Sequence, residues 1–327
     1  MRSGWEEISQ LDELVKKAHK VTEQVNQVIL GKEAVVEEAF LALLADGHIL
    51  LEDIPGVGKT TLALALSKTM ALDCKRIQFT PDVMPSDLTG FSVYRRDEER
   101  FVYQPGSVFC NLLLADEINR ASPKTQSALL EVMEERRVSV EGLTREVPHP
   151  FLVIATENPV GSAGTQCLPE SQVDRFMVTA SLGYPDFENE LAMAMAVDGS
   201  DRTSALEAVI DREDVLAMQR AVHQVYMKES VCRYLLELVS ATRTYSDLDQ
   251  GASPRATIAL VKMAKAAAWF RGRGYVTPDE VRRQFPYVVS HRIRRSAAAR
   301  MENRKKDDII KNILQTVKEP PMGEKPL

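Results

Sequence analysis

The hydrophobic pattern of the chain changes near residue 48 from helical spacing to short apolar runs. Before that point, residues 8–28 and about 32–44 place apolar side chains on one helical face. Beyond it, helical or inserted segments separate a series of short apolar runs at 48–52, 76–79, 111–116, 151–156 and 176–182. Strands that alternate with helices predict a parallel sheet with helices on both faces. We therefore expect an α/β fold.

Two segments interrupt this alternation and predict β-hairpins. Residues 91–104 alternate between apolar and polar positions around a charged tip at 95–100. We expect the apolar side chains of this hairpin to share one face: Phe91, Val93, Phe101 and Tyr103. Residues 137–150 alternate in the same way around Glu141-Gly142. Because an isolated two-stranded hairpin is only marginally stable, the first hairpin must pack on the body or meet a partner.

The strand signals end at residue 186, and the remainder of the chain predicts helices. Residues 1–186 would form the α/β domain, with the N-terminal helix and both hairpins. Residues 187–302 are rich in Ala, Leu, Met and Arg at helical spacing, which predicts a smaller α-helical lid domain. Residues 303–327 are polar and contain proline, so we expect a polar tail there.

The composition is typical of a soluble globular protein, with 44% hydrophobic and 27% charged residues. The cysteines are scattered and form no C-x-x-C pair, as expected for reduced thiols in a cytosolic protein. The N-terminus has no apolar signal-peptide core, and the apolar stretches are too short to span a bilayer. We therefore expect a cytoplasmic protein without membrane insertion.

The net charge of −6 conceals a strongly basic segment. Between residues 251 and 306, 14 Lys and Arg residues stand against 3 Asp and Glu residues. Such a segment on an acidic body would face nucleic acid, phosphates or the acidic surface of a neighbouring subunit, or it would be an ordinary solvated helical face. The sequence leaves these alternatives open.

The strongest chemical signal is LLEDIPGVGKTT at residues 50–61, where an apolar strand runs into a glycine-rich turn and a helix. Such a loop directs backbone N–H groups and the positive end of the helix dipole at phosphate oxygens. Lys59 would reach the β- and γ-phosphates of a nucleotide, and the Thr60 hydroxyl would bind Mg²⁺. Asp53 stands where the strict pattern has glycine. The nucleotide-binding residues predicted from this loop are Pro55, Gly56, Val57, Gly58, Lys59, Thr60 and Thr61.

A second signal is LLLADEINR at residues 112–120, an apolar run that ends in two carboxylates. It places Asp116 and Glu117 at the carboxyl end of a strand, where α/β proteins bind ligands. Asp116 would hold Mg²⁺, largely through water, and Glu117 would orient and polarise the attacking water. An acidic pair after a strand is a weak signal alone, but here it follows a P-loop. The two motifs together predict ATP and Mg²⁺ as ligands and ATP hydrolysis as the reaction.

These motifs resemble the Walker A and Walker B elements of AAA+ ATPases. The sequence around them resembles the MoxR family, of the helix-2-insert group. Six blocks in the family's order cover roughly residues 20–300: EDIPGVGKT, QFTPDVMPSDLTG, LLADEINRASPKTQSALLEVMEER, IATENP, LPESQVDRF and SLGYPD. Aspartate at position 53 is usual in that family. The resemblance implies an AAA+ core, which is a P-loop parallel sheet covered by helices, followed by an α-helical lid domain.

The resemblance also implies roles for residues outside the two motifs. Asn158 matches sensor 1, which contacts the γ-phosphate or the attacking water. Arg175 matches the arginine finger that a neighbouring subunit inserts, and Arg255 matches sensor 2 in the lid. Arg120 is a further candidate for a subunit contact. The segment that packs on adenine corresponds to Val28, Ile29 and Gly31.

Ordinary structural roles remain open for the same residues, and two positions depart from the family pattern. Asn158 alone would fit a strand-end cap, Arg175 a surface salt bridge and Arg255 a first-turn helix residue. Glu157 stands where the family commonly has Gln. Residues 161–164, beside the finger region, contain glycines where the family is acidic and glycine-poor. The second departure would alter coupling between subunits without removing the finger.

The resemblance finally implies partners and a cellular role. Because the finger comes from the next subunit, it implies a ring homo-oligomer, a hexamer, together with a partner that carries a von Willebrand A domain. The implied function is chaperone-like remodelling, maturation or activation of a partner complex. The alternative is a nucleic-acid motor that uses the basic segment 251–306, although the acidic overall charge makes nucleic acid the weaker candidate. A slow nucleotide switch fits poorly with a complete set of Lys59, Asp116, Glu117 and Asn158.

Overall fold

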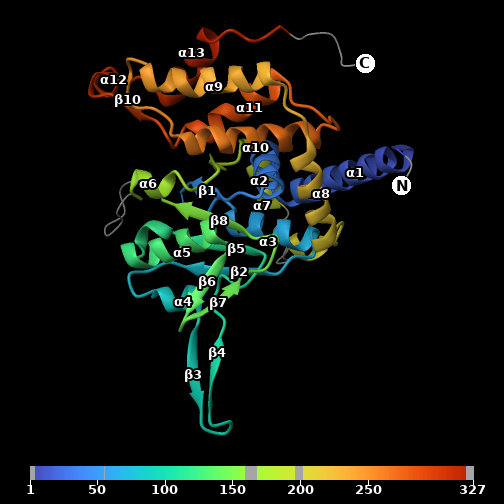
Figure 1. Cartoon of the computed structure of the whole chain (residues 1–327), viewed down its shortest axis with the longest axis vertical. Coiled ribbons are helices and arrows are strands. Elements are labelled where there is room, and N and C mark those ends of the chain that lie inside the picture. The colour runs from blue at the N-terminus through green and yellow to red at the C-terminus, as the bar shows by residue number, and fades with distance from the viewer. Residues whose placement is uncertain (1–3, 55, 159–167, 196–201, 322–327) are drawn as a thin grey trace.

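The fold is a parallel sheet with helices on both faces, joined to a helical lid (Figure 1). The computed structural model describes residues 4–54, 56–158, 168–195 and 202–321. The strand order of the main sheet is β2-β5-β8-β1-β9, and its pairings are parallel. These strands are β1 (Ile49–Glu52), β2 (Cys74–Gln78), β5 (Leu112–Asp116), β8 (Leu152–Glu157) and β9 (Val178–Ala180). The predicted α/β fold is confirmed.

Strand β5 shows why an unbroken apolar run belongs in the middle of this sheet. Every residue of β5 is buried, and its side chains alternate between two hydrophobic clusters. Leu112 and Leu114 pack in the cluster that contains side chains of α3 (Lys59–Thr69), and Leu113 packs in the cluster that contains those of α5 (Pro123–Glu135). Because successive strand side chains point to opposite faces, an apolar run requires cover on both sides.

Two N-terminal helices connect the sheet to the lid. Helices α1 (Gly4–Val28) and α2 (Glu33–Leu44) pack on each other, α1 also contacts α3, and α2 contacts the long lid helix α10 (Pro254–Phe270). The ring centroids of Phe40 and Phe270 lie 6.0 Å apart in this contact. One hydrophobic cluster therefore runs from the sheet into the lid. No helix among the described residues has the length and apolarity needed to cross a bilayer.

The lid extends beyond the helices that the sequence predicted. It contains α7 (Phe187–Met195), α8 (Arg212–Gln224), α9 (Glu229–Thr244), α10, α11 (Pro278–Val289) and α12 (Ala297–Met301), with the short strands β10 (Leu248–Gln250) and β11 (Arg294–Arg295). The prediction of a polar tail from residue 303 is wrong for α13 (Lys306–Thr316). Ile309, Ile310 and Ile313 of this helix are buried, and it contacts α9 and α11. A narrow apolar stripe among charged residues is sufficient to hold a helix on a core.

Short elements join these parts. They are the helices α4 (Pro85–Thr89) and α6 (Glu170–Val173) and the 3₁₀ turns η1 (Ile118–Arg120) and η2 (Arg202–Ala205). Helix α4 precedes the first hairpin, and α6 lies between β8 and β9. Turn η1 follows β5 directly, so it fixes the direction of the chain just after the acidic pair.

Both predicted hairpins are present, but the faces of the first one differ from the prediction. Strand β3 (Phe91–Arg95) pairs with β4 (Arg100–Gln104) and projects from the body, and β6 (Arg137–Val140) pairs with β7 (Leu143–Glu146) (Figure 1). Val93 lies opposite Val102 and Tyr94 opposite Phe101. Phe91 and Val93 therefore occupy one face, and Phe101 and Tyr103 the other. The turn sets the register, and shifting one strand by one residue exchanges its two faces.

A buried carboxyl group lies where the lid meets α2. Glu38 of α2 is buried, and Gln284 of α11 donates a hydrogen bond from Nε2 to its Oε1 at 2.8 Å. Burial raises the pKa of Glu38 from 4.5 to about 8, against the hydrogen bond from Gln284, which favours the ionised form, and Glu37 raises it further while Arg271 lowers it. The other oxygens of this pair, Glu38 Oε2 and Gln284 Oε1, have no hydrogen-bond partner among the described residues. A protonated Glu38 would convert one of these two acceptors into a donor.

We expect Glu38→Gln to stabilise the protein at alkaline pH and to leave it nearly unchanged at pH 5. Because the folded pKa of Glu38 lies above its unfolded value, its contribution is complete below pH 4.5 and is lost as pH rises toward about 8. The parent would lose on the order of 1.4 kcal/mol of unfolding free energy per pH unit in that window. Urea unfolding at a series of pH values measures this slope. Glu33→Gln, on an exposed carboxylate of the same helix, is the control, and equal slopes in all three proteins would contradict the assignment.

Candidate functional site

The glycine-rich loop between β1 and α3 is open on the side where phosphates would bind. Gly56 and Gly58 have φ angles of +87° and +97°, and beyond its chain neighbours a Cβ on either residue would meet no atom of the described residues within 4 Å. Such positive φ angles favour glycine. Gly58 caps α3, so the amides at the start of that helix face the same open space. The predicted P-loop geometry is therefore present in residues 56–61, whereas Pro55 lies outside the described residues.

Lys59 is held across this loop by backbone carbonyls. Its Nζ donates to the carbonyl oxygens of Asp53 at 3.1 Å and Ile54 at 3.3 Å. The residue is only 9% exposed although it carries a charge. Burial of an ammonium group beside an open cradle of amides concentrates positive charge at one point, which favours an anion with several oxygens.

The two carboxylates at the end of β5 are fixed by different partners. The Thr156 hydroxyl of β8 donates to Asp116 Oδ1 at 3.0 Å and accepts the Glu117 backbone N–H at 2.8 Å. Asp116 Oδ2 also receives Nε and Nη2 of Arg76 on β2, at 2.9 and 2.8 Å. Glu117 has a left-handed backbone, with φ +55°, and its Oε2 lies 2.9 Å from Nε of Arg120. The turn after β5 thus directs two adjacent side chains to separate positions.

A cavity of about 330 Å³ brings the two motifs together. Its lining residues come from the loop, from the start of α3 and from the ends of β2 and β5: Gly56, Gly58, Lys59, Thr60, Thr61, Arg76, Gln78, Asp116 and Glu117. Sequence reasoning missed Arg76 and Gln78. They occupy alternate positions of the edge strand β2, beside β5. Residues two apart in a strand point to the same face, and this spacing was the signal in the sequence that could have placed both at the site.

The donor set of this cavity fits a magnesium nucleotide. Hard cations such as Mg²⁺ prefer carboxylate and hydroxyl oxygens, and Asp116 and Thr60 supply one of each on the same cavity wall. Amides and an ammonium group supply the complementary charge for phosphates. The described residues contain no group of three or more His, Cys, Asp and Glu residues that could hold a metal ion. When a nucleotide is bound, Thr60 and Asp116 are the residues of this cavity that would hold Mg²⁺.

The aspartate that replaces the first glycine of the motif has a structural role. Asp53 is buried, and its carboxylate accepts the Ser181 hydroxyl at 2.8 Å and the backbone N–H groups of Leu182 at 2.6 Å and Gly183 at 2.8 Å. These bonds join the end of β1 to the chain that leaves β9. The side chain therefore anchors the start of the glycine-rich loop, which glycine at this position could not do.

The two predicted arginines lie together, away from this cavity. Arg175, just after α6, places Nη1 3.1 Å from Oε2 of Glu134, and Arg255 of α10 places Nη2 2.6 Å from Oε1 of the same carboxylate. All three line a separate cavity of about 290 Å³, with Lys262 and Arg136. The lining residues described for this cavity and for the P-loop cavity do not overlap. Sequence reasoning missed Glu134, which is one of several charged residues on α5.

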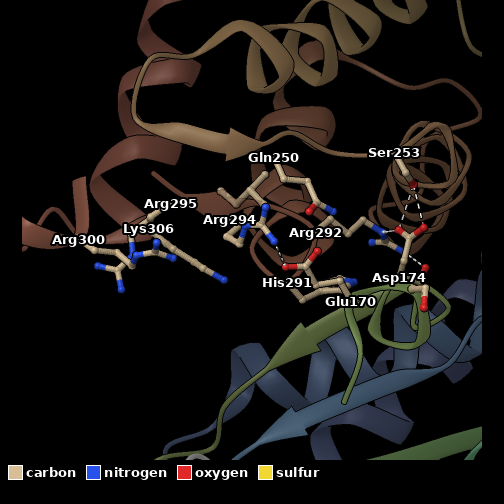
Figure 2. A pocket seen from close by; sticks show the side chains of 12 residues that line it. Glu170, Asp174, Gln250, Ser253, His291, Arg292, Arg294, Arg295, Arg300 and Lys306 are labelled. Carbon is tan, nitrogen blue, oxygen red and sulfur yellow. Dashed lines mark hydrogen bonds and ion pairs between the residues drawn. The ribbon is translucent and has the colours of Figure 1, made fainter. Parts of the chain in front are cut away.

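The backbone beside Arg175 is fastened to the lid. Figure 2 shows Asp174 between Ser253 and Arg292. The Ser253 hydroxyl donates to both Asp174 oxygens at 3.0 and 2.9 Å, and Arg292 Nε donates to Oδ1 at 2.8 Å. Burial lowers the pKa of Arg292, against the attraction of Asp174. This ion pair, in which Arg292 is buried and Asp174 half-buried, fixes the position from which Arg175 extends.

Comparisons with known proteins agree with this arrangement. The profile of the ATPase family associated with various cellular activities (AAA) matches residues 48–178, and that of the AAA lid domain matches residues 240–313. Chaperone MoxR1 of Mycobacterium tuberculosis is 38% identical over 314 residues, which cover 93% of this chain and 82% of that protein. The chain belongs to the MoxR family of AAA+ ATPases.

Two further relatives match this MoxR-family protein over nearly its whole length. The uncharacterized protein YeaC of Bacillus subtilis is 45% identical over 301 residues, or 92% of this chain and 94% of that protein. The crystal structure of a candidate ATPase from Cytophaga hutchinsonii has a TM-score of 0.89 and 38% identity, and the match covers 95% of this chain and 97% of that one. The parallel sheet and the helical domain are therefore the AAA+ core and its lid, as predicted.

The remaining family positions do not line the P-loop cavity. Val28 and Ile29 are buried at the end of α1. A Cβ on Gly31 would lie 2.3 Å from the amide of Asn189 on α7, so the loop after α1 fits closely against that helix. Val57 packs against the cluster that contains Ile29. The assignment of this segment to adenine stays a prediction.

Asn158 and its neighbour lie at the end of β8. The backbone carbonyl of Asn158 accepts a hydrogen bond from Nδ2 of Asn119 at 3.5 Å. Burial raises the pKa of Glu157, with a smaller contribution from Glu52 on the adjacent strand, and the backbone N–H of Leu168 donates to its carboxylate at 3.3 Å. The sensor role of Asn158 stays a prediction, and residues 161–164 lie outside the described residues.

Proposed function

We propose that this MoxR-family protein binds ATP with Mg²⁺ in the P-loop cavity and hydrolyses it. The observation that carries the proposal is the convergence of the open amide cradle, Lys59, Thr60, Asp116 and Glu117 on one cavity. Backbone amides and Lys59 would bind the β- and γ-phosphates. Bound Mg²⁺, held by Thr60 and Asp116, would supply positive charge for the phosphate oxygens.

The side chains suit an in-line displacement at the γ-phosphorus. Glu117 would accept a proton from the attacking water while the water oxygen bonds to phosphorus and the bond to the ADP oxygen breaks. Arg120 and the bond from the Glu117 backbone to Thr156 orient that carboxylate. Asn158 would position the γ-phosphate or the water from the adjacent strand. In this scheme the loop binds the nucleotide, and Glu117 takes part in proton transfer and not in binding.

A direct test is nucleotide affinity in a Lys59→Ala variant. Because the ammonium group makes charge-assisted contacts with phosphate, its loss should weaken ATP binding by about 10- to 100-fold. Isothermal titration calorimetry with ATP and Mg²⁺ measures the change. Lys124→Ala removes an exposed lysine of α5 and should bind ATP like the parent. Equal affinity in both variants would exclude this loop as the phosphate site.

We further propose that the protein works as a ring homo-oligomer, a hexamer, in which Arg175 and Arg255 serve a neighbour's nucleotide. Both arginines share the Glu134 carboxylate and lie at a cavity without P-loop residues. That arrangement favours a contact of both arginines with the nucleotide of a neighbouring subunit over a contact with the nucleotide in the P-loop cavity of the same subunit. Glu134 would act as a positioning residue that keeps the two guanidinium groups together.

We also propose that the protein remodels, matures or activates a partner complex in a chaperone-like manner. It would work in the cytoplasm together with a partner protein that carries a von Willebrand A domain. The relative in Mycobacterium tuberculosis carries the name chaperone. The projecting hairpin β3–β4 presents exposed aromatic side chains on one face, with Tyr94 and Phe101 paired at 5.3 Å. Its base is braced, because Arg145 lies 3.8 Å from the ring centroid of Tyr103 and Ser92 donates to Glu141 at 2.6 Å.

Trimming residues 95–100 to a short glycine-containing turn should separate client contact from subunit bracing. A client contact predicts an intact ring and basal ATPase activity but loss of the response to the partner. Bracing predicts loss of the ring itself. Sedimentation with ATP and ATPase assays with the partner measure both properties, and Tyr94→Ser with Phe101→Ser tests the aromatic face alone. Leu143→Ser, in the second hairpin, is the control for a general loss of exposed apolar surface.

A further inference from the structure

A third polar cavity, of about 440 Å³, lies between the AAA+ core and the lid (Figure 2). Its walls come from α6 and the chain after it, from the segment around β11, and from the first residue of α13. The charged residues that line it are Glu170, Asp174, Arg292, Arg294, Arg295, Arg300 and Lys306. None of the described residues that line it also lines the P-loop cavity. Five of the 14 Lys and Arg residues of the basic segment 251–306 therefore line one cavity.

The two carboxylates of this cavity already have partners. Glu170 pairs with Arg294 at 2.9 Å, and Asp174 pairs with Arg292 at 2.8 Å. Figure 2 shows these pairs toward one end of the cavity. They neutralise two of its five cations, so the charge that remains belongs to the other three.

Arg295, Arg300 and Lys306 gather at the opposite end (Figure 2). In the part of the chain that the structure describes, none of the three forms an ion pair with a carboxylate. Arg295 donates to the backbone carbonyl of Arg304 at 2.7 Å, and Lys306 donates to that of Ser290 at 2.9 Å. Each keeps further N–H donors for a ligand.

Lys306 is a half-buried cation. Burial lowers its pKa, the attraction of Glu52 is the largest opposing effect, Arg295 lowers the pKa further, and Glu170 and Asp307 oppose the shift without reversing it. In the part of the chain that the structure describes, none of these carboxylates comes close enough to form an ion pair with Lys306. A phosphate group in the cavity would contact the three cations directly and would offset the repulsion between Arg295 and Lys306.

We propose that Arg295, Arg300 and Lys306 bind the phosphate group of a small anionic ligand in this cavity. Guanidinium groups match the geometry of phosphate oxygens, and the lysine adds a point charge. The volume falls in the range of small-molecule sites, roughly 300–1,000 Å³. A concave site of this size favours a phosphorylated small molecule or inorganic phosphate over an extended nucleic-acid backbone, which would need a groove that continues beyond one cavity.

The position of the cavity connects a bound ligand to the contact between the lid and the chain beside Arg175. Asp174 contributes to its wall and is also the residue that fastens the Arg175 backbone to the lid. A ligand that holds α13 and β11 together would stabilise the lid surface on which Asp174 rests. This step depends on the proposed role of Arg175, whereas phosphate binding itself does not.

The test is phosphate binding by the full chain in which the P-loop has been disabled. Inorganic phosphate, and separately pyrophosphate, are titrated into Lys59→Ala protein by calorimetry at constant ionic strength. Binding should persist there and should weaken by about 10- to 100-fold when Lys306→Met or Arg300→Gln is added. Lys305→Met removes the adjacent, exposed lysine, which does not line the cavity, and should leave the affinity unchanged. Arg300 is exposed, so its substitution leaves the packing of the fold intact.

Two outcomes would overturn the proposal. The first is the absence of phosphate and pyrophosphate binding in the Lys59→Ala background. If Arg300→Gln then also abolishes ring assembly, or binding to a single-stranded oligonucleotide, the cluster belongs to a macromolecular contact. The second is equal weakening by Lys305→Met and Lys306→Met, which indicates non-specific attraction. The calorimetry measures phosphate binding and not turnover. The two proposals can therefore fail separately, because a protein that does not hydrolyse ATP could still bind phosphate in this cavity.

Discussion

Replacing Glu117 by Gln is expected to lower ATP hydrolysis by about 10²–10⁴-fold while ATP binding persists. The amide keeps the shape of the side chain but cannot accept the proton of the attacking water. The backbone turn that presents residue 117, with its bond to Thr156, does not depend on the carboxylate. The variant should therefore remain folded and should accumulate bound ATP.

Two measurements on the same protein check this expectation. Nucleotide affinity by calorimetry should match the parent, and steady-state phosphate release should fall. Glu146→Gln, on an exposed carboxylate of the second hairpin, is the control for loss of one negative charge. A Glu117→Gln protein with near-normal turnover would remove Glu117 from the role of general base and would leave Asp116 as the remaining carboxylate of the cavity.

Replacing Arg175 by Ala is expected to lower hydrolysis by about 10³–10⁵-fold, because an arginine that stabilises the transferring phosphoryl group can contribute that much. The effect should appear in trans. A mixture of Arg175→Ala and Lys59→Ala subunits should recover part of the activity, since some interfaces then combine an intact P-loop with an intact arginine. Arg233→Ala, on an exposed arginine of α9, should have no effect.

Glu134 provides a second measurement of the same arrangement. If it positions Arg175 and Arg255, Glu134→Gln should lower the hydrolysis rate by about tenfold without changing ATP affinity. Adding it to Arg175→Ala should then cost little more, because both changes act on one unit. Glu135→Gln changes the neighbouring carboxylate, which pairs with exposed Arg137, and is the matched control. No recovery in the mixed subunits, under conditions of proven exchange, would contradict the trans assignment.

The parts of this protein that the sequence predicted are those that depend on local order. The alternation of apolar runs and helices requires a sheet covered on both faces, and the structure confirms it. The glycine-rich loop could be found because its residues follow one another in the chain, and Gly56 and residues 58–61 line one cavity. The acidic pair could be placed because the carboxyl ends of parallel strands meet at one edge.

Other features depended on packing and could not be read from local pattern. The faces of the first hairpin were predicted wrongly because alternation leaves the register to the turn, which pairs Val93 with Val102. Helix α13 was missed because three buried isoleucines among charged residues need a partner surface before they are recognisable as a core face. The anchoring of the loop by Asp53 required the chain after β9, about 130 residues away, to be brought beside β1.

By itself, the sequence determined the fold class, the family and the place of the glycine-rich loop, because each rests on residues close together in the chain. Only the tertiary structure decided which distant charges meet. It brought Arg175 and Arg255 onto Glu134, fastened Asp174 to Arg292, and gathered Arg295, Arg300 and Lys306 at one end of a cavity. The physical reason is that electrostatic interactions act over a few ångströms of space, whatever the separation along the chain.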